Sequence, residues 1–136
     1  MKTTFEIAVF QGDGIGPEIM APTLGLLSEL AADGGYALNF VDAPAGAAHY
    51  RETGESFPVA SMQAARSADA ILLSAMGLPD VRYPDGTEIS PQIDLRKALT
   101  LFAGVRPVTI RPGQPTPLAT DKPVDFVLIR ESTEGL

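Results

Sequence analysis

The chain has 136 residues, a formal net charge of −7, no cysteine and no tryptophan. That length suits about one ordinary domain, and the balance of 45% apolar and 20% charged residues is typical of a folded protein. The acidic balance disfavours nucleic-acid binding, the lack of cysteine excludes disulfides and thiol chemistry, and the single histidine excludes a multi-histidine metal site. No apolar stretch approaches the ~20 residues of a membrane span. The N-terminus lacks a signal-peptide pattern, so we expect a cytoplasmic protein that binds neither membranes nor nucleic acid.

The charge is distributed unevenly along the chain. Residues 1–90 hold 4 Lys+Arg against 12 Asp+Glu, whereas residues 91–136 hold 6 against 5. The later part of the chain contains a group of arginines: Arg96, Arg106, Arg111 and Arg130. Their grouping needs an explanation that the overall charge does not provide.

Strand-like and helix-like segments alternate along the chain. Short apolar, β-prone runs predict strands at 5–10, 36–41, 70–74, 105–110 and 125–130. Apolar residues at helical spacing predict helices at 17–33, 58–67 and 93–102. Pro22 should kink the first helix or delay its start, and loops are predicted at 43–57, 79–91 and 111–123. This alternation predicts an α/β fold with parallel strand pairing.

A glycine-rich turn, Gln-Gly-Asp-Gly-Ile-Gly-Pro-Glu at 11–18, separates the first strand from the first helix. A dinucleotide-binding fingerprint needs G-x-G-x-x-G, but here the glycines alternate and Asp13 would place a carboxylate where phosphates bind. No Gly-Lys-Ser/Thr follows, which excludes a P-loop. The residues alone favour a tight turn that needs positive φ angles, and an ordinary Rossmann dehydrogenase is a disfavoured alternative.

Three segments, in order and at matching spacing, resemble one enzyme family. The turn at 11–18 resembles the G-D-G-I-G-P-E opening of the β-decarboxylating dehydrogenases, which act on isopropylmalate, isocitrate, homoisocitrate, tartrate or D-malate. Leu-Arg-Lys at 95–97 with Leu-Phe-Ala-Gly-Val-Arg-Pro at 101–107 resembles the family's L-R-K/Q…L-[FY]-A-N-[LI]-R-P segment. Residues 127–135 resemble V-[IV]-[VI]-R-E-x-[TS]-[EG]-G. The resemblance covers the whole chain but about the first third of a family member.

The resemblance implies an isopropylmalate dehydrogenase-like two-domain α/β fold, distinct from a standard Rossmann fold. Residues 1–103 would belong to the first, cofactor-side domain, and residues 104–136 would begin the second, substrate and dimerisation domain. The family is commonly dimeric, so a homodimer is expected of the complete protein.

The resemblance assigns substrate binding to three arginines, Arg96, Arg106 and Arg130. A guanidinium presents a planar set of donors that fits a carboxylate bidentately, and the family's substrates are 2-hydroxy acids with two or three carboxylates. Arg96 would project from a helix and the other two from strands, so that all three converge on one pocket. Arg111 matches no motif and is expected at the surface.

The implied reaction is an oxidative decarboxylation in which the substrate's hydroxyl carbon gives a hydride to NAD or NADP. Mg²⁺ or Mn²⁺ would polarise the nascent carbonyl. The family's catalytic lysine and tyrosine and its metal-binding aspartates correspond to positions after Leu136. We therefore expect no catalytic or metal-binding residue in this chain, and no dehydrogenase activity from it in isolation.

Further positions follow from the same resemblance. Residues expected to contact the cofactor are Ile15, Gly77, Leu78, Glu88 and Gly104, and those expected to contact the substrate's variable group are Ser90, Gln92 and Ile93. Ser90 matches the serine that meets the γ-carboxylate in isocitrate enzymes, and Gln92 stands where those enzymes carry asparagine and isopropylmalate enzymes carry leucine. Burying such polar groups unpaired costs ~1–3 kcal/mol each, which disfavours an isopropyl tail. We expect a malate, tartrate or isocitrate-like substrate; the loop at 82–86 matches no family pattern.

A second reading is a non-enzymatic acidic α/β domain that binds an anion or assembles with a partner. A single observation distinguishes the two hypotheses. If the chain is part of such an enzyme, we expect its coding sequence to continue past Leu136 and to encode a tyrosine, then a lysine and spaced aspartates.

Overall fold

The computed structural model describes residues 2–120 and 122–131. The chain forms two compact units, Met1–Leu95 and Arg96–Leu136, and the division falls within helix α4 (Pro91–Leu99). The border after residue 103 that the family resemblance implies concerns domains of the complete protein, and it stays a prediction.

The first unit contains a three-stranded parallel sheet. Its strands are β1 (Thr4–Phe10), β2 (Ala37–Asp42) and β3 (Ala70–Leu73), in the order β2-β1-β3. Ala8 in the central strand lies opposite Val41 on one side and Ile71 on the other. The strands predicted at 5–10, 36–41 and 70–74 and their parallel pairing are confirmed.

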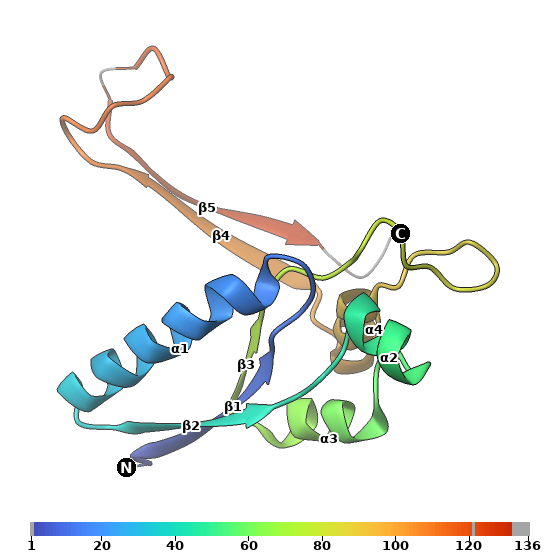
Figure 1. Ribbon diagram of the computed structural model, residues 1–136. Helices are drawn as coiled ribbons and strands as arrows, with labels where there is room; N and C mark the ends of the chain where they lie inside the picture. Colours follow the sequence, from blue (N-terminus) through green and yellow to red (C-terminus); the bar gives the residue numbers. More distant parts are fainter. Residues whose placement is uncertain (1, 121, 132–136) are drawn as a thin grey trace. The chain divides into compact units, whose positions relative to one another are not determined.

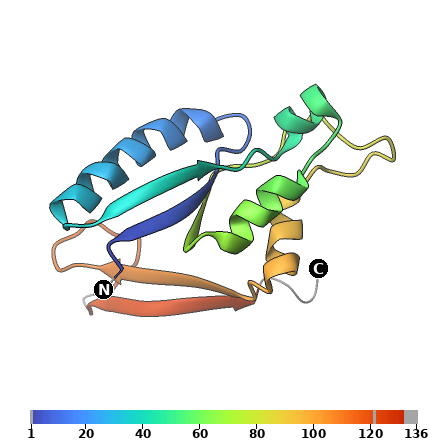
Figure 2. The same ribbon diagram turned by 90° about the horizontal axis from the view of Figure 1, so that it is seen from below.

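Helices connect these strands on opposite faces of the sheet. α1 (Gly16–Asp33) joins β1 to β2, while α2 (Ala47–Thr53) and α3 (Val59–Ser67) join β2 to β3. The two crossovers run in opposite directions across the sheet. Right-handed connections therefore place α1 on one face and α3 on the other, as Figures 1 and 2 show.

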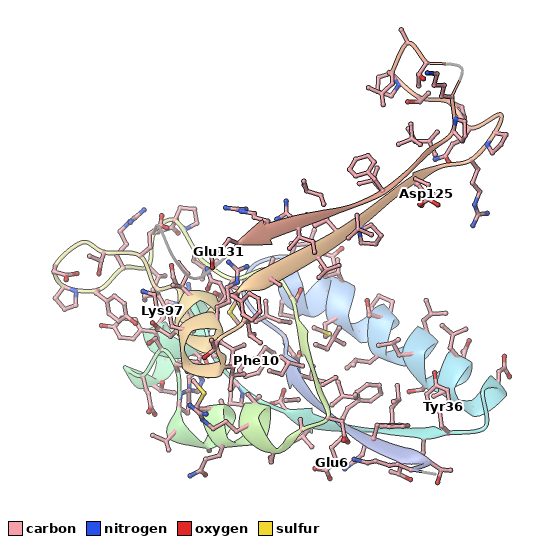
Figure 3. The ribbon with its side chains drawn as sticks, turned by 180° about the vertical axis from the view of Figure 1, so that it is seen from behind. Glu6, Phe10, Tyr36, Lys97, Asp125 and Glu131 are labelled. Atoms are coloured by element: carbon pink, nitrogen blue, oxygen red, sulfur yellow. The ribbon has the colours of Figure 1, made fainter. Side chains whose placement is uncertain are left out.

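Helix α1 follows the apolar pattern of its sequence. Met20 and Ala31 are buried and Leu24 and Leu27 are half-buried, whereas Leu30 is 52% exposed. The helix is continuous through Pro22, so the predicted delay of its start is wrong. It ends where the Gly34 N–H bonds the Leu30 carbonyl, and Figure 3 shows Tyr36 beside this end.

The loop predicted at 43–57 is wrong in part, because it contains α2. This helix has only seven residues, follows Gly46 with a φ of 118°, and has no side-chain cap from its own N-cap residue. Without an apolar stripe or a local capping signal, the sequence gives no reason to expect it. Its N-terminus is instead satisfied by a residue far away in the chain, described below.

The core of the first unit is centred on the carboxyl half of β1. Ala8, Val9 and Phe10 are at most 2% exposed, and the Phe10 ring meets the Phe57 ring edge-on with centroids 5.8 Å apart. Such aromatic pairs add stability beyond their buried area. The strand end that leads into the glycine-rich turn is therefore fully buried.

The second unit contains a β-hairpin. β4 (Ala103–Ile110) and β5 (Val124–Glu131) pair antiparallel from Ala103 opposite Glu131 to Ile110 opposite Val124. Figure 3 shows Asp125 and Glu131 at opposite ends of β5. The general expectation of parallel pairing is wrong here, because a parallel pair needs a crossover, usually helical, and the proline-rich segment 111–123 cannot form one.

Helix α4 ends at Leu99, earlier than the predicted end at 102. Thr100 has a φ of 55°, a left-handed conformation that interrupts the helix. Among the described residues, no helix is long and apolar enough to span a membrane.

The glycines of the first unit differ in how far they tolerate a side chain. A Cβ on Gly12, whose φ is +75°, would lie 2.0 Å from the backbone oxygen of Ala75, whereas a Cβ on Gly25 within α1 would meet nothing within 4 Å. We expect Gly12→Ala to lower the free energy of unfolding by about 2–4 kcal/mol. The matched Gly25→Ala should raise it by about 1 kcal/mol through helix propensity. Urea denaturation measures both, and equal effects would contradict the assigned close approach.

Candidate functional site

A buried aspartate holds together the segments that surround the candidate site. Asp13 is 2% exposed, and its carboxylate accepts backbone N–H groups from Ala47 at 2.9 Å, Ala48 at 2.7 Å and Gly77 at 2.7 Å. Its own N–H donates to the Ala75 carbonyl at 2.7 Å. The glycine-rich turn, the start of α2 and the loop after β3 are thus joined at one side chain.

This arrangement explains why the turn does not bind phosphate in the manner of a dinucleotide fingerprint. The N–H groups at the start of α2 point at the Asp13 carboxylate, which occupies the place an external anion would take. A Cβ on Gly46 would lie 2.6 Å from Asp13 Oδ2, so the chain passes this carboxylate at a distance that only glycine permits. The aspartate of the motif is a structural anion.

A cavity of about 220 Å³ lies beside the loop after β3, entirely within the first unit. Its lining residues come from residues 76–79 and from the segment that leads into α4. They are Met76, Gly77, Leu78, Pro79, Arg82, Glu88, Ile89, Ser90 and Gln92. The structure therefore brings together five of the residues predicted from sequence: Gly77, Leu78, Glu88, Ser90 and Gln92.

One residue that lines the cavity carries an unsatisfied polar group. Gln92 Oε1 is buried and has no hydrogen-bond partner among the described residues. An unpaired buried amide oxygen costs free energy, and because this atom is itself closed to solvent, a molecule in the cavity meets it only if the Gln92 side chain rotates. Ile89, by contrast, is 2% exposed and supplies an apolar wall.

A tight loop closes one side of the cavity. Arg82 and Glu88 form an antiparallel bridge, and Arg82 Nη2 lies 3.1 Å from Glu88 Oε1 while Nη1 donates to the Gly86 carbonyl at 3.3 Å. Within the loop, the Thr87 N–H and hydroxyl donate to the Asp85 carboxylate at 2.9 and 2.7 Å. These bonds lower the pKa of Asp85 below its ordinary value, the backbone bond contributing most.

The same loop is anchored to α2 and to the segment after it. The Tyr83 hydroxyl hydrogen-bonds Ser56 Oγ at 2.6 Å, and the Tyr83 ring meets the Tyr50 ring with centroids 5.2 Å apart. Sequence reasoning missed Arg82 as a site residue. A signal was present, because Pro-Asp-Gly at 84–86 is typical of a tight turn that brings its flanking residues, Arg82 and Glu88, together.

The predicted cofactor residues fall in different environments. Gly77 lines the cavity, but its N–H already donates to Asp13 and is therefore not available to a ligand. Glu88 pairs with Arg82. Ile15 is 59% exposed at the N-cap of α1 and is not among the cavity's lining residues. Gly104 belongs to the second unit, where it lies opposite Arg130.

Arg106 and Arg130 share one face of the β4–β5 hairpin. Arg106 lies opposite Leu128 and Arg130 opposite Gly104, so the two arginines are diagonal neighbours across the ladder. Such positions are typically ~7–8 Å apart and lie on the same side of the sheet. Opposite Arg130, Gly104 offers no side chain. Two cations on one face form a surface on which a compound with two carboxylates can be bound.

The remaining predicted substrate residues lie on α4. Ile93 is half-buried and does not line the cavity, and Arg96 is exposed near the helix end, where its carbonyl accepts the Leu101 N–H. The convergence of Arg96 with the hairpin arginines stays a prediction. In the part of the chain described, no group of three or more His, Cys, Asp or Glu residues is placed to hold a metal ion.

Comparison with known proteins identifies what this arrangement resembles. The sequence profile of the isocitrate/isopropylmalate dehydrogenase family matches residues 6–136. The 3-isopropylmalate dehydrogenase of Clavibacter michiganensis subsp. michiganensis is 41% identical over 138 residues, covering 99% of this chain and 39% of that protein. The enzyme of the same name from Thermobifida fusca is 41% identical over 135 residues, covering 97% and 38%.

Solved structures agree with the sequence relatives. The isocitrate dehydrogenase of Methylococcus capsulatus superposes with a TM-score of 0.75 at 28% identity, covering 97% of this chain and 36% of that one. A β-decarboxylating dehydrogenase of Thermococcus kodakarensis gives 0.64 at 26%, covering 92% and 40%. The chain thus spans about two-fifths of the length of these proteins. The family resemblance and fold class expected from sequence are confirmed.

Neutralising Asp13 tests whether its charge is what organises this region. Asp13→Asn keeps the shape but turns one acceptor into a donor that faces backbone N–H groups. We expect the free energy of unfolding to fall by about 2–4 kcal/mol, because hydrogen bonds to charged groups are lost and buried N–H groups are left unpaired. Asp80→Asn, on the exposed loop after Pro79, is the matched control and should change it by less than about 0.5 kcal/mol. An Asp13→Asn protein as stable as the control would show that the carboxylate is dispensable.

Proposed function

Because this chain belongs to the isocitrate/isopropylmalate dehydrogenase family, we propose that the complete protein oxidatively decarboxylates a 2-hydroxy di- or tricarboxylic acid with NAD or NADP. The observation that carries the proposal is that Arg106 and Arg130 lie on the same face of the hairpin as diagonal neighbours. Both arginines stand in the family's motifs, and two neighbouring guanidinium groups match a feature that all these substrates share, carboxylates on adjacent carbons.

The arginines contribute binding and orientation. A bidentate contact fixes a carboxylate in both position and plane, and two such contacts, with Arg96 as a third, hold the carbon skeleton in one pose. Holding the hydroxyl carbon in that pose removes the entropy cost of aligning it with a hydride acceptor. The positive charge of the arginines also offsets the free-energy cost of removing water from the substrate's carboxylates.

The cavity supports a role for one end of the cofactor. Its volume of about 220 Å³ is below the ~300–1,000 Å³ of pockets that enclose a whole small ligand. It therefore suits the terminal ring of a dinucleotide or the variable tail of the substrate. When bound, NAD(P) supplies the hydride acceptor. The divalent cation that the resemblance implies finds no ligand cluster among the described residues, and no step is assigned to it.

We propose further that the substrate carries a small or polar γ-substituent, as in malate, tartrate or an isocitrate-like acid. Ser90 and Gln92 line the cavity, and Gln92 Oε1 is buried without a partner. An isopropyl tail offers no hydrogen-bond partner to these two side chains, whereas a polar tail or its bound water can pair with them once the Gln92 amide turns toward the cavity. A homodimer and a cytoplasmic location are proposals that rest on the family resemblance.

A substrate panel tests the reaction and its specificity together. NAD- and NADP-linked absorbance assays of the complete protein with isopropylmalate, D-malate, tartrate and isocitrate should give the highest kcat/KM for one of the last three. A preference for isopropylmalate contradicts the specificity proposal. No NAD(P)H from any of them contradicts the dehydrogenase proposal and favours the non-enzymatic anion-binding domain.

Replacing the hairpin arginines tests the carboxylate-binding role. Arg106→Met and Arg130→Met keep the apolar stem but remove the charged donors, so kcat/KM should fall by about 10- to 100-fold for each, as expected for lost hydrogen bonds to charged groups. Arg111→Met removes an exposed arginine from the connector that follows β4 and should leave kcat/KM unchanged. Equal losses in all three variants would show that overall charge, rather than a defined site, is responsible.

A further inference from the structure

Arg111 is the member of the late arginine group that the proposed function does not use. It lies in the connector between β4 and β5, residues 111–123, where it lines a cavity of about 330 Å³ together with Lys122. We propose that this cavity is a binding site for a small organic phosphate monoester, separate from the arginine face of the hairpin. The inference goes beyond the proposed function and does not depend on it.

The cavity lies entirely within the second unit. The end of β4, the connector and the residue before β5 form its walls, at the end of the hairpin that Figure 1 shows in orange. Its volume falls within the ~300–1,000 Å³ of pockets that enclose a small ligand, unlike the cavity beside the loop after β3. Its other lining residues are Ile110, Pro112, Gly113, Gln114, Thr116, Thr120 and Pro123.

The charges that line the cavity are all positive. Arg111 and Lys122 are both exposed, and no acidic residue is among the described residues that line the cavity with them. Within the described part of the chain, neither cation takes part in an ion pair. A ligand with two negative charges would neutralise both cations, so the lining favours a dianion.

The uncharged polar side chains of the cavity present donors as well. Gln114 Oε1 accepts the Arg111 N–H at 3.1 Å, which leaves the Nε2 amide of Gln114 to donate elsewhere. Thr116 Oγ1 and Thr120 Oγ1 each accept a backbone N–H at 3.1 Å, so each hydroxyl keeps its proton for another acceptor. Because these side-chain acceptors are engaged by the connector itself, what they offer a ligand is donors, and an anion rich in acceptors fits that set.

A phosphate fits these donors better than a carboxylate. Arg111 follows β4 and Lys122 precedes β5, with the other polar lining residues between them, so the donors come from separate parts of the connector. A phosphate monoester has three acceptor oxygens and a charge near −2, so it can accept from several directions. A carboxylate has two oxygens in one plane, which a single guanidinium satisfies.

The remaining part of the lining is apolar, which favours an organic ester over inorganic phosphate. Ile110 is half-buried, and Pro112 and Pro123 are exposed beside the two cations. Inorganic phosphate would leave these side chains in contact with water. A small apolar group attached to the phosphate would cover them and gain the free energy of apolar burial.

The connector is partly ordered before any ligand arrives. The Gln114 N–H donates to the Arg111 carbonyl at 3.0 Å across a tight turn in which Gly113 has a φ of 80°. Four prolines within residues 111–123 further restrict the backbone. Donors presented by a restricted segment lose less conformational freedom on binding, which favours affinity.

Isothermal titration calorimetry of the complete protein with phenyl phosphate tests the site. Binding should persist in the double variant Arg106→Met/Arg130→Met, in which the arginine face of the hairpin is disabled. Arg111→Met and Lys122→Met should each raise the Kd by about 10- to 100-fold, the loss expected for hydrogen bonds between charged groups. Arg51→Met, which removes an exposed arginine of α2 outside this cavity, is the matched control and should leave the Kd unchanged.

Two further ligands test the chemical class. Inorganic phosphate lacks the organic group, and succinate carries its two charges on carboxylates, so each should bind about 5-fold more weakly than phenyl phosphate or worse. Succinate or inorganic phosphate binding as tightly as phenyl phosphate would overturn the assigned class.

The site itself is tested by the same titrations. A Kd that neither Arg111→Met nor Lys122→Met changes would place the phosphate elsewhere on the protein and overturn the inference. Loss of binding in the Arg106→Met/Arg130→Met variant would assign the phosphate to the hairpin face instead. Absence of binding by the unaltered protein up to about 10 mM phenyl phosphate would overturn the inference too.

Discussion

The buried carboxylate of Asp13 is the interaction on which the first unit depends. Removing a charge from water is costly unless it is fully hydrogen-bonded, and here three backbone N–H groups and the positive end of α2 replace the lost water. Because all three donors are backbone groups, they reach the carboxylate only if three segments meet at one point. The surrounding glycines follow from that demand, since a side chain on Gly12 or Gly46 would occupy the space the converging segments need.

This interaction also fixes one wall of the cavity. Gly77 donates to Asp13 and lines the cavity with its neighbours Met76 and Leu78, so the position of that wall depends on the glycine-rich turn. The loop that carries Arg82 and Glu88 is held through the contacts of Tyr83 with Ser56 and with Tyr50, which lies on α2 and so on a helix that Asp13 also anchors. The glycines and the aspartate of the turn at 11–18 thus position the segments around the cavity. Asp13 itself is bonded to backbone N–H groups and not to a ligand.

Local sequence patterns were sufficient to predict β1, β2, β3 and α1, because each of these elements has an apolar run or stripe and is followed by a turn. They were insufficient for α2, whose N-terminus is satisfied by a carboxylate 34 positions earlier in the chain. The hairpin shows the same limit. Spacing identifies β4 and β5 as strands, but which residues share a face depends on their register, and only the pairing of Arg130 with Gly104 shows that Arg106 and Arg130 lie on one side. Arg82 was not predicted as a site residue, because it lies in no family motif, although the turn residues beside it could be recognised in the sequence.

The proposed binding of a polyanionic substrate by an acidic protein raises an apparent contradiction. Exposed charges more than about 8–10 Å apart are largely screened at physiological ionic strength, so a bound carboxylate responds to the guanidinium groups it touches more than to the net charge of −7. Under the proposed function, the arginines that count are those in the family motifs, and two of them, Arg106 and Arg130, share one face of the hairpin. Such binding would depend on where individual guanidinium groups stand in the fold rather than on the sign of the chain's total charge, so a net charge of −7 does not argue against it.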